Sequence, residues 1–272
     1  MSDHSVDKAF SGSIPAVYER YLVPLLFQPY ADDLVNRMKT NPPSHVLEVA
    51  AGTGVVTRAM AKALPKSTQI IATDLNPGMI EQATSVEIAR PVERRQADAI
   101  QLPFEAGTFD TVVCQFGVMF FPDKPKAHAE TLRVLKPGGR FLFNVWDSLE
   151  ANPIAAVVTS ALAQMFPADP PQFLPRTPFG YYDRARLAQD LAAGGFTAAP
   201  EIITVPARSR AASAQDVAIA YCQGTPLRAE IETRDPSKLA AATDAAAAAV
   251  AARFGNGAID VPMQAVVVVA KK

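Results

Sequence analysis

The chain has 272 residues, 49% of them hydrophobic, which is enough to bury the core of one large α/β domain or of two modest lobes. Its 26 basic and 27 acidic residues nearly cancel to a net charge of −1, and no run of Lys and Arg is interleaved with aromatics, so composition argues against a nucleic-acid partner. The two cysteines, Cys114 and Cys222, have no metal-ligand spacing; a reduced, cytoplasmic chain is the simpler interpretation, with a disulfide left open.

The amino-terminal segment does not have the pattern expected of a signal peptide. Residues 1–10 are mixed polar and charged and lack the apolar core of a signal peptide, and His4 falls in a tail expected to fray. The apolar windows at 154–166 and 265–270 are shorter than the roughly 20 residues that span a bilayer, so we predict no membrane insertion. Residues 13–39 have apolar residues at helical spacing and predict two helical pieces. Pro24 is expected to separate them.

The stretch from His45 to Met60 organises the prediction. Val46, Leu47 and Val49 form a short apolar run typical of a buried strand. Gly52 and Gly54 then supply a turn that few other residues can adopt, with room for a ligand against the backbone. The pattern from 55 to 64 is helical. Strand, glycine-rich turn and helix, in that order, predict a small-molecule pocket at the carboxyl edge of a sheet.

A second apolar run ends at Asp74, about 20 residues past Gly54, which is the usual spacing for an acid that accepts hydrogen bonds from ribose hydroxyls. A helix cap before Asn76 is the alternative role and is compatible with ribose binding. Thr57 stands where a dinucleotide fingerprint needs a small residue, and the chain has no Gly-Lys-Ser/Thr phosphate loop. A nucleoside ligand without phosphates, of which S-adenosylmethionine is the obvious one, is therefore favoured.

The remaining elements alternate between strand and helix. Expected strands are 92–97, 109–115, 140–146, 201–205 and 261–270. One helix is expected to begin at Pro77, and further helices are expected at 126–136, 152–166, 183–193, 214–222 and 236–254. His128 is expected on a solvated helix face. The proline- and aromatic-rich segment 167–182 is incompatible with regular structure and suits either a lid over an apolar substrate or a loop that buries its own aromatics. The alanine-rich helix could pack on the domain or make a dimer contact.

Four blocks resemble the class I S-adenosylmethionine-dependent methyltransferases, in particular the small-molecule group that includes the quinone C-methyltransferases. They are VLEVAAGTG (46–54), IIATDLNPGMIEQA (70–83), QADAIQLPFEAGTFDTVVCQFGVMFFPD (96–123) and ETLRVLKPGGRFLFNVW (130–146). One departure is Ala50, which stands where the family often has its first glycine. The resemblance implies an α/β fold with a doubly wound, mostly parallel seven-stranded, Rossmann-like sheet whose last strand is antiparallel. It also implies an N-terminal helical lid and a helical insertion between the last two strands.

We accordingly expect residues 1–40 to form the lid and 41–147 the S-adenosylmethionine-binding core. Residues 148–272 should complete the fold, with a lid loop at 167–182 and the insertion at 207–256. The cofactor positions implied by the resemblance are Tyr18, Tyr21, Glu48, Ala50, Ala51, Gly52, Thr53, Gly54, Asp74, Leu75, Met79, Asp98, Ala99, Ile100, Gln115 and Phe116. Asp98 would accept a hydrogen bond from the adenine amine, or else serve only as a turn residue. Tyr18 and Tyr21 would close over the methionine end, or else only pack on the sheet.

The function predicted on this basis is S-adenosylmethionine-dependent methylation of a small, apolar or aromatic molecule, with S-adenosylhomocysteine as product. O-, C- and N-methylation are left open. The expected acceptor pocket comprises Met119, Trp146, Phe179, Tyr181 and Tyr182. The chain lacks the Asn/Asp-Pro-Pro-aromatic block of nucleobase and glutamine-amide methyltransferases. No histidine is well placed as a general base, so no catalytic residue or metal ligand is assigned.

Two other functions compete with this prediction: a non-catalytic cofactor-binding protein of the same fold, and an NAD-linked oxidoreductase. The expected partner is a small-molecule substrate, without nucleic acid, and a homodimer is left open.

Overall fold

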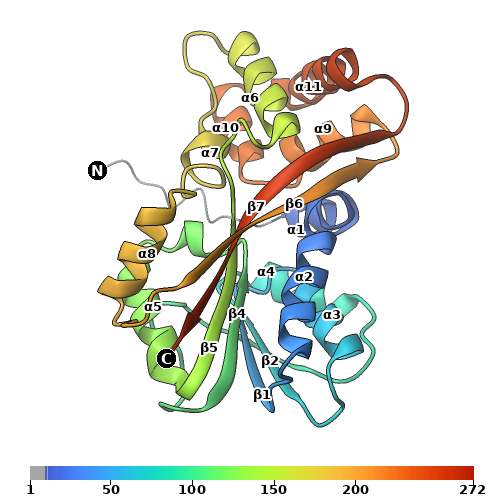
Figure 1. Ribbon diagram of the computed structural model, residues 1–272. Helices are drawn as coiled ribbons and strands as arrows, with labels where there is room; N and C mark the ends of the chain where they lie inside the picture. The colour runs from blue at the N-terminus through green and yellow to red at the C-terminus, as the bar shows by residue number, and fades with distance from the viewer. Residues whose placement is uncertain (1–9, 11) are drawn as a thin grey trace.

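The computed structural model describes residue 10 and residues 12–272, and its centre is one seven-stranded sheet (Figure 1). The strands lie in the order β3-β2-β1-β4-β5-β7-β6; β1 to β5 are parallel, and β7 is antiparallel to both of its neighbours. The doubly wound fold with an antiparallel last strand is therefore confirmed. The strands are β1 (His45–Val49), β2 (Gln69–Asp74), β3 (Glu93–Gln96), β4 (Phe109–Gln115), β5 (Leu135–Trp146), β6 (Glu201–Ala211) and β7 (Ile259–Lys271).

Helices cover both faces of the sheet. In Figure 1, α2, α3 and α4 lie on one side of it, and α5 and α8 lie on the other. The strand order reverses between β1 and β4, and in such sheets ligands bind outside the carboxyl ends of the strands at that point. These helices, with the short ones beside them, are α1 (Ile14–Val17), η2 (Tyr18–Phe27), α2 (Gln28–Lys39), α3 (Val55–Ala63), α4 (Pro77–Ser85), η3 (Val118–Phe120), α5 (Lys124–Val134) and α8 (Arg184–Ala193).

The leading helix does not break at Pro24, contrary to expectation. Residues 14–39 are continuously helical, and Pro24 lies inside the wide-turned π-helix η2. At its end the Gln28 amide donates to the carbonyl of Val23, five residues back. A wider turn relieves the clash that a proline ring makes in an α-helix, so the chain continues without stopping.

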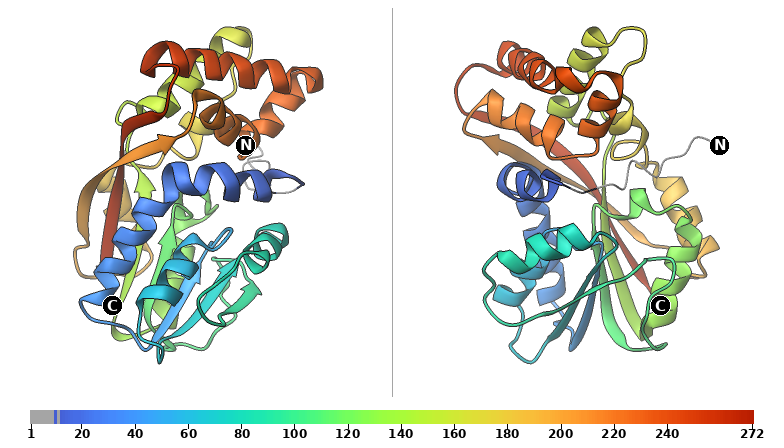
Figure 2. Two further views of the ribbon diagram at one scale, coloured as in Figure 1. Left: turned by 90° about the vertical axis from the view of Figure 1, so that its right-hand side faces the viewer. Right: turned by 180° about the vertical axis from the view of Figure 1, so that it is seen from behind.

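The last two strands carry a second, helical lobe. They pair from Glu201–Val269 to Ala211–Ile259, well beyond the rest of the sheet. Figure 2 shows the lobe above the carboxyl edge of the parallel strands, with α1 and η2 between the two halves of the molecule. The lobe consists of α6 (Pro153–Met165), α7 (Phe173–Arg176), α9 (Ala214–Gln223), α10 (Leu227–Arg234), η4 (Pro236–Lys238) and α11 (Leu239–Phe254). Alanine-rich α11 packs on α6 and α9.

Both long strands exceed their expected lengths because polar residues extend them. Arg208 and Arg210 of β6 pair with Asp260 of β7 across the ladder. Cross-strand ion pairs stabilise this end of the two strands, which lacks the run of apolar residues by which their buried ends were predicted. The insertion between β6 and β7 is correspondingly shorter than residues 207–256. A second correction concerns segment 167–182, which contains one helical turn, α7.

The prediction of a solvated His128 is wrong. The side chain is fully buried, and its ring stacks on Phe143 with centroids 5.8 Å apart. Helix α8 packs over α5, and Gly194 at its end lies so close that a Cβ there would be 2.5 Å from the His128 Cβ. Burial lowers the His128 pKa to about 4, so the ring is neutral at physiological pH.

No helix within residues 12–272 is both long enough and apolar enough to cross a bilayer.

We predict that Gly194→Ala destabilises the protein by about 1–3 kcal/mol, because the added methyl overlaps the His128 side chain and the Pro125 carbonyl oxygen. Urea denaturation followed by circular dichroism measures the change. The matched control is Gly257→Ala, since no atom lies within 4 Å of a Cβ at that position; it should change stability by less than about 0.5 kcal/mol. Equal stability of the two variants would show that α5 and α8 are not packed this closely.

Candidate functional site

The turn after β1 presents bare backbone to a cavity. Ala50, Gly52 and Gly54 have φ of 54°, 57° and 86°, all in the left-handed region. A Cβ added at Gly52 would meet nothing closer than the Tyr18 hydroxyl, at 3.9 Å, so the backbone there faces free space. A non-glycine residue at position 50 carries strain of about 1–2 kcal/mol, which its environment must offset.

Asp74 ties this turn to the end of β2. One carboxylate oxygen accepts from the Gly52 amide at 2.8 Å, and the other accepts from the Asn76 amide at 2.8 Å. The side chain is 6% exposed and lines the cavity. Burial raises its pKa, while the amide hydrogen bonds lower it in part. The hydrogen bond from the Asn76 amide makes a turn before α4, so Asp74 both shapes the loop and borders the cavity.

One cavity at the carboxyl ends of β1, β2 and β4 collects many of the predicted site residues. Those that line it are Tyr18, Ala50, Gly52, Asp74, Leu75, Met79, Asp98, Ala99, Gln115, Phe116, Trp146 and Phe179. Asp98 accepts from the Ile100 amide at 3.1 Å, which orients its carboxylate beside the cavity. The topology thus brings the two acids, Asp74 and Asp98, to the same side of the molecule as the glycine turn.

Other predicted residues do not line this cavity: Tyr21, Glu48, Ala51, Thr53, Gly54, Ile100, Met119, Tyr181 and Tyr182. Glu48 is 1% exposed and accepts a hydrogen bond from the Thr57 hydroxyl of α3. Burial raises the Glu48 pKa to about 8. Tyr181 donates to Asp190 at 2.8 Å, and Tyr182 is 38% exposed. The roles of these residues stay predictions.

Several lining residues were missed at the level of sequence: Phe10, Leu22, Leu26, Phe27, Val49, Asn76, Ala97, Gly117, Phe120, Phe121, Pro122, Phe173, Leu174, Pro178, Tyr221 and Thr225. The proline- and aromatic-rich composition of 167–182 was the one available signal for Phe173 and Pro178. Nothing in the local sequence places Tyr221 and Thr225 there, because they reach the cavity only through the packing of α9 against η2.

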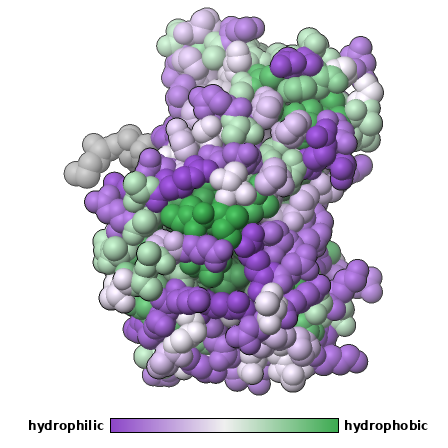
Figure 3. Space-filling view, in the orientation of Figure 1, coloured by the Kyte–Doolittle hydropathy of each residue, from purple (hydrophilic) through white to green (hydrophobic). Residues whose placement is uncertain are grey.

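The cavity has two chemically different halves. The half beside the glycine turn carries Asp74, Asp98 and Gln115, and the other half is walled by aromatic and aliphatic side chains. In the apolar half Phe116 stacks on Trp146 with ring centroids 3.9 Å apart, and the Phe179 ring lies 5.7 Å from that of Trp146. Figure 3 shows apolar residues gathered in a hollow midway down the molecule, at the junction of its two halves.

Two features of the polar half indicate a site built for a ligand. The Gln115 side-chain oxygen is buried without a hydrogen-bond partner among the described residues, while its amide donates to the Phe27 carbonyl at 3.3 Å. Leu75 is 43% exposed at the cavity although it is large and apolar. A ligand with a hydrogen-bond donor would bond the Gln115 oxygen, and a planar apolar group on the same ligand would cover Leu75.

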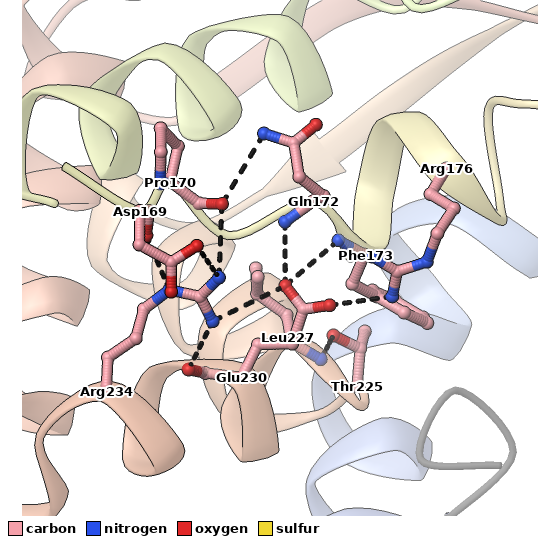
Figure 4. A network of polar contacts seen from close by, with 9 residues as sticks. All are labelled: Asp169, Pro170, Gln172, Phe173, Arg176, Thr225, Leu227, Glu230 and Arg234. Carbon is pink, nitrogen blue, oxygen red and sulfur yellow. Dashed lines mark hydrogen bonds and ion pairs between the residues drawn. The ribbon is translucent and has the colours of Figure 1, made fainter. Parts of the chain in front are cut away.

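A carboxylate of the helical lobe holds the wall of the apolar half in place (Figure 4). Glu230 of α10 accepts from the backbone amides of Gln172 at 2.7 Å and Phe173 at 3.1 Å, at the start of α7, and pairs with Arg176 at 2.7 Å. Arg234, one turn along α10, binds Asp169 at 3.0 Å. Loop 169–179 and the lobe are therefore one packed unit.

Among the residues that the structure describes, no cluster of three or more His, Cys, Asp or Glu side chains is arranged to hold a metal ion.

Comparisons with known proteins indicate a methyltransferase domain. A family model described as a methyltransferase domain matches residues 47–143. The demethylmenaquinone methyltransferase of Lactiplantibacillus plantarum is 40% identical over 103 residues, which are 36% of this chain and 44% of that protein. The demethylmenaquinone methyltransferase of Deinococcus radiodurans is 30% identical over 165 residues, which are 57% of this chain and 68% of that protein. The aligned part thus spans under half of the first relative and about two thirds of the second.

A solved structure shares the fold over nearly the whole chain. It is phosphoethanolamine N-methyltransferase 2 of Haemonchus contortus in complex with phosphomonomethylethanolamine and S-adenosylhomocysteine. The TM-score is 0.60 at 16% identity, and the match covers 98% of this chain and 59% of that one.

We predict that Glu48→Gln flattens the pH dependence of stability between about pH 4.5 and 8. The folded-state pKa of about 8 lies above the unfolded value, so the folded protein keeps a proton that the unfolded chain releases. Wild-type stability therefore falls as pH rises through this window, by on the order of a few kcal/mol, and the variant lacks that loss. Urea denaturation at several pH values measures it. Glu81→Gln, at an exposed site of α4, should keep the wild-type slope; a wild-type slope in the Glu48 variant would contradict the assignment.

We predict that Glu230→Ala loosens the apolar wall, because two amides and Arg176 lose a charged partner, at a cost of about 1.5–3 kcal/mol. Trp146 is the chain's single tryptophan, so acrylamide quenching of its fluorescence reports on the wall directly. Quenching should increase in Glu230→Ala. It should stay at the wild-type level in Glu232→Ala, a nearby α10 residue that pairs with Arg228 on the same helix. Unchanged quenching in both variants would show that the clamp does not hold the wall.

Proposed function

The chain belongs to the class I S-adenosylmethionine-dependent methyltransferases, and from that premise we propose that it transfers a methyl group from S-adenosylmethionine to a small, apolar or aromatic molecule. One observation carries the proposal: a single cavity joins a polar half beside the glycine turn to an apolar aromatic half. In-line methyl transfer requires the donor and acceptor to meet in one water-poor space.

The polar half fits an adenosine-bearing cofactor. Asp74 has lone pairs beyond those used by the Gly52 and Asn76 amides, and these would accept from ribose hydroxyls. Asp98 would accept from the exocyclic amine of adenine, and Leu75 and Met79 would lie against the base. The unpartnered oxygen of Gln115 would accept from a donor on the same molecule. When bound, S-adenosylmethionine supplies a methyl group on a positively charged sulfur.

The apolar half has no charged side chain among its described lining residues, and this determines which acceptors it can bind. Among the described lining residues, the carboxylates are Asp74 and Asp98, both in the polar half, and no histidine, lysine or arginine is present. A cationic amine would lose its hydration there without gaining an anionic partner. The chain's own contribution is to orient an apolar acceptor and exclude water, so the acceptor supplies its own acidity, as a phenol or an activated carbon does.

Neither alternative function gains support from the site. An NAD-linked oxidoreductase needs a helix start close enough to hold a pyrophosphate, whereas Thr57 is buried there and donates to Glu48. A non-catalytic cofactor-binding protein does not require an apolar space beside the cofactor half of the cavity, whereas methyl transfer does. Consumption of labelled S-adenosylmethionine in the presence of an organic extract of cell metabolites would establish the activity, and none with any extract would favour the non-catalytic function.

Domain roles, partners and location form part of the same proposal. Residues 1–40, of which 1–9 and 11 lie outside the described residues, would act as the lid. Residues 41–147 would act as the cofactor-binding core, and the remainder as the acceptor-selecting part. The free, buried Cys114 and Cys222 suit a reducing compartment such as the cytoplasm. A small molecule is the proposed partner, with no role for nucleic acid. A homodimer is compatible with the outward alanine face of α11, and sedimentation equilibrium would reveal it.

We predict that Asp74→Asn weakens binding of S-adenosylhomocysteine by about 10–100-fold, because an amide nitrogen replaces an oxygen that accepts from a backbone amide and would accept from ribose. Isothermal titration calorimetry measures the affinity. Asp244→Asn, at an exposed position of α11, serves as the matched control and should bind like the wild type. Wild-type affinity in Asp74→Asn would rule out the ribose role.

A further inference from the structure

The apolar half of the cavity contains one hydroxyl that no protein group uses. Tyr221 of α9 lines the cavity and is 3% exposed, and its hydroxyl makes no hydrogen bond to any residue that the structure describes. A hydroxyl at a cavity wall without a protein partner is free to form a hydrogen bond to a ligand or a water molecule. The Tyr221 hydroxyl is therefore available to a molecule that enters the cavity.

The neighbouring hydroxyl provides a contrast. Thr225 lines the same part of the cavity, but its hydroxyl donates to the Tyr221 carbonyl at 2.7 Å and accepts from the Leu227 amide at 3.2 Å. Its hydrogen bonds thus serve the turn between α9 and α10. Of the two hydroxyl groups that this part of the described chain brings to the cavity, only that of Tyr221 is available to a ligand.

Tyr221 is held on a rigid support. Its neighbours Ala220 and Cys222 are fully buried. Gly224, at the end of α9, packs so closely on η2 that a Cβ there would lie 3.0 Å from the Leu22 side chain. A polar group fixed on a packed helix orients a ligand better than one on a mobile loop. Burial also raises the Tyr221 pKa, so the phenol stays protonated and acts as a donor.

We propose that Tyr221 binds an oxygen atom of the acceptor molecule and so selects apolar ring compounds that carry a hydrogen-bond-accepting oxygen, such as a ring-attached carbonyl. This inference rests on the proposed function. Discrimination arises because a substrate without the oxygen leaves the hydroxyl desolvated and unpaired, which disfavours binding. Tyr221 lies outside residues 47–143, which the methyltransferase family model matches, and belongs to the insertion between β6 and β7.

The test compares two planar probes on protein saturated with S-adenosylhomocysteine: 2-acetylnaphthalene, and 2-isopropenylnaphthalene, in which a CH₂ group replaces the carbonyl oxygen. Calorimetry gives both affinities for the wild type and for Tyr221→Phe. The variant should bind the ketone about three- to tenfold more weakly and the alkene within about twofold of the wild type. Tyr30→Phe removes a tyrosine hydroxyl that donates to the Val205 carbonyl at 3.3 Å and does not line the cavity, so it should change neither affinity.

Each outcome decides the matter. An equal change for both probes, or no change for the ketone, overturns the role of Tyr221; in the second case the indole N–H of Trp146 becomes the candidate donor. Failure of both probes to bind the wild-type complex overturns the acceptor class. Loss of folding in Tyr221→Phe overturns the claim that the hydroxyl has no structural partner. Failure of the wild type to bind S-adenosylhomocysteine would instead count against the proposed function.

Discussion

The hydrogen bond from the Gly52 amide to the Asp74 carboxylate is the constraint on which the rest of the site depends. It joins the turn after β1 to the end of β2 at 2.8 Å, where the Asp74 side chain is buried. Burial makes the carboxylate costly unless amides surround it, and amides in a left-handed turn need a partner in the same way. The Gly52 amide and the Asp74 carboxylate are partners for each other. Their hydrogen bond fixes the shape of the turn, so that its backbone faces the cavity.

The two halves of the cavity are built by different parts of the chain. The polar half comes from consecutive strand–turn–helix units, where each functional residue lies at the last position of a strand or a few positions after it. The apolar half needs β6 and β7 to extend past the sheet and carry α9 to α11 back over it. Glu230 then fixes loop 169–179 to that lobe. The acceptor side thus depends on segments outside the strand–turn–helix units that form the cofactor side.

This division explains what could be predicted from sequence. The glycine turn, Asp74, Asp98 and the strand order follow from short-range patterns and from resemblance, and the structure has the predicted fold. Tyr221 and Thr225 could not be found because they lie far along the chain from the glycine turn, and helix packing, not spacing, brings them to the cavity. His128 was misjudged because its charged sequence neighbours gave no sign of the helix α8 that covers it. Tertiary packing overrides local polarity in each case.

Phe116 lies where the halves meet, and its geometry shows how their separation is maintained. Its φ of 49° is unfavourable for a bulky residue, yet its amide donates to the Asn144 side chain at 2.8 Å and its ring stacks on Trp146 at 3.9 Å. Both partners belong to β5, so the sheet itself holds the strained residue. Strain of this kind persists only where the surroundings over-determine it. A ring held against the neighbouring strand fixes the boundary between the two halves of the cavity, and the proposed methyl transfer needs such a fixed reference, because the donor and the acceptor would be held by different parts of the chain.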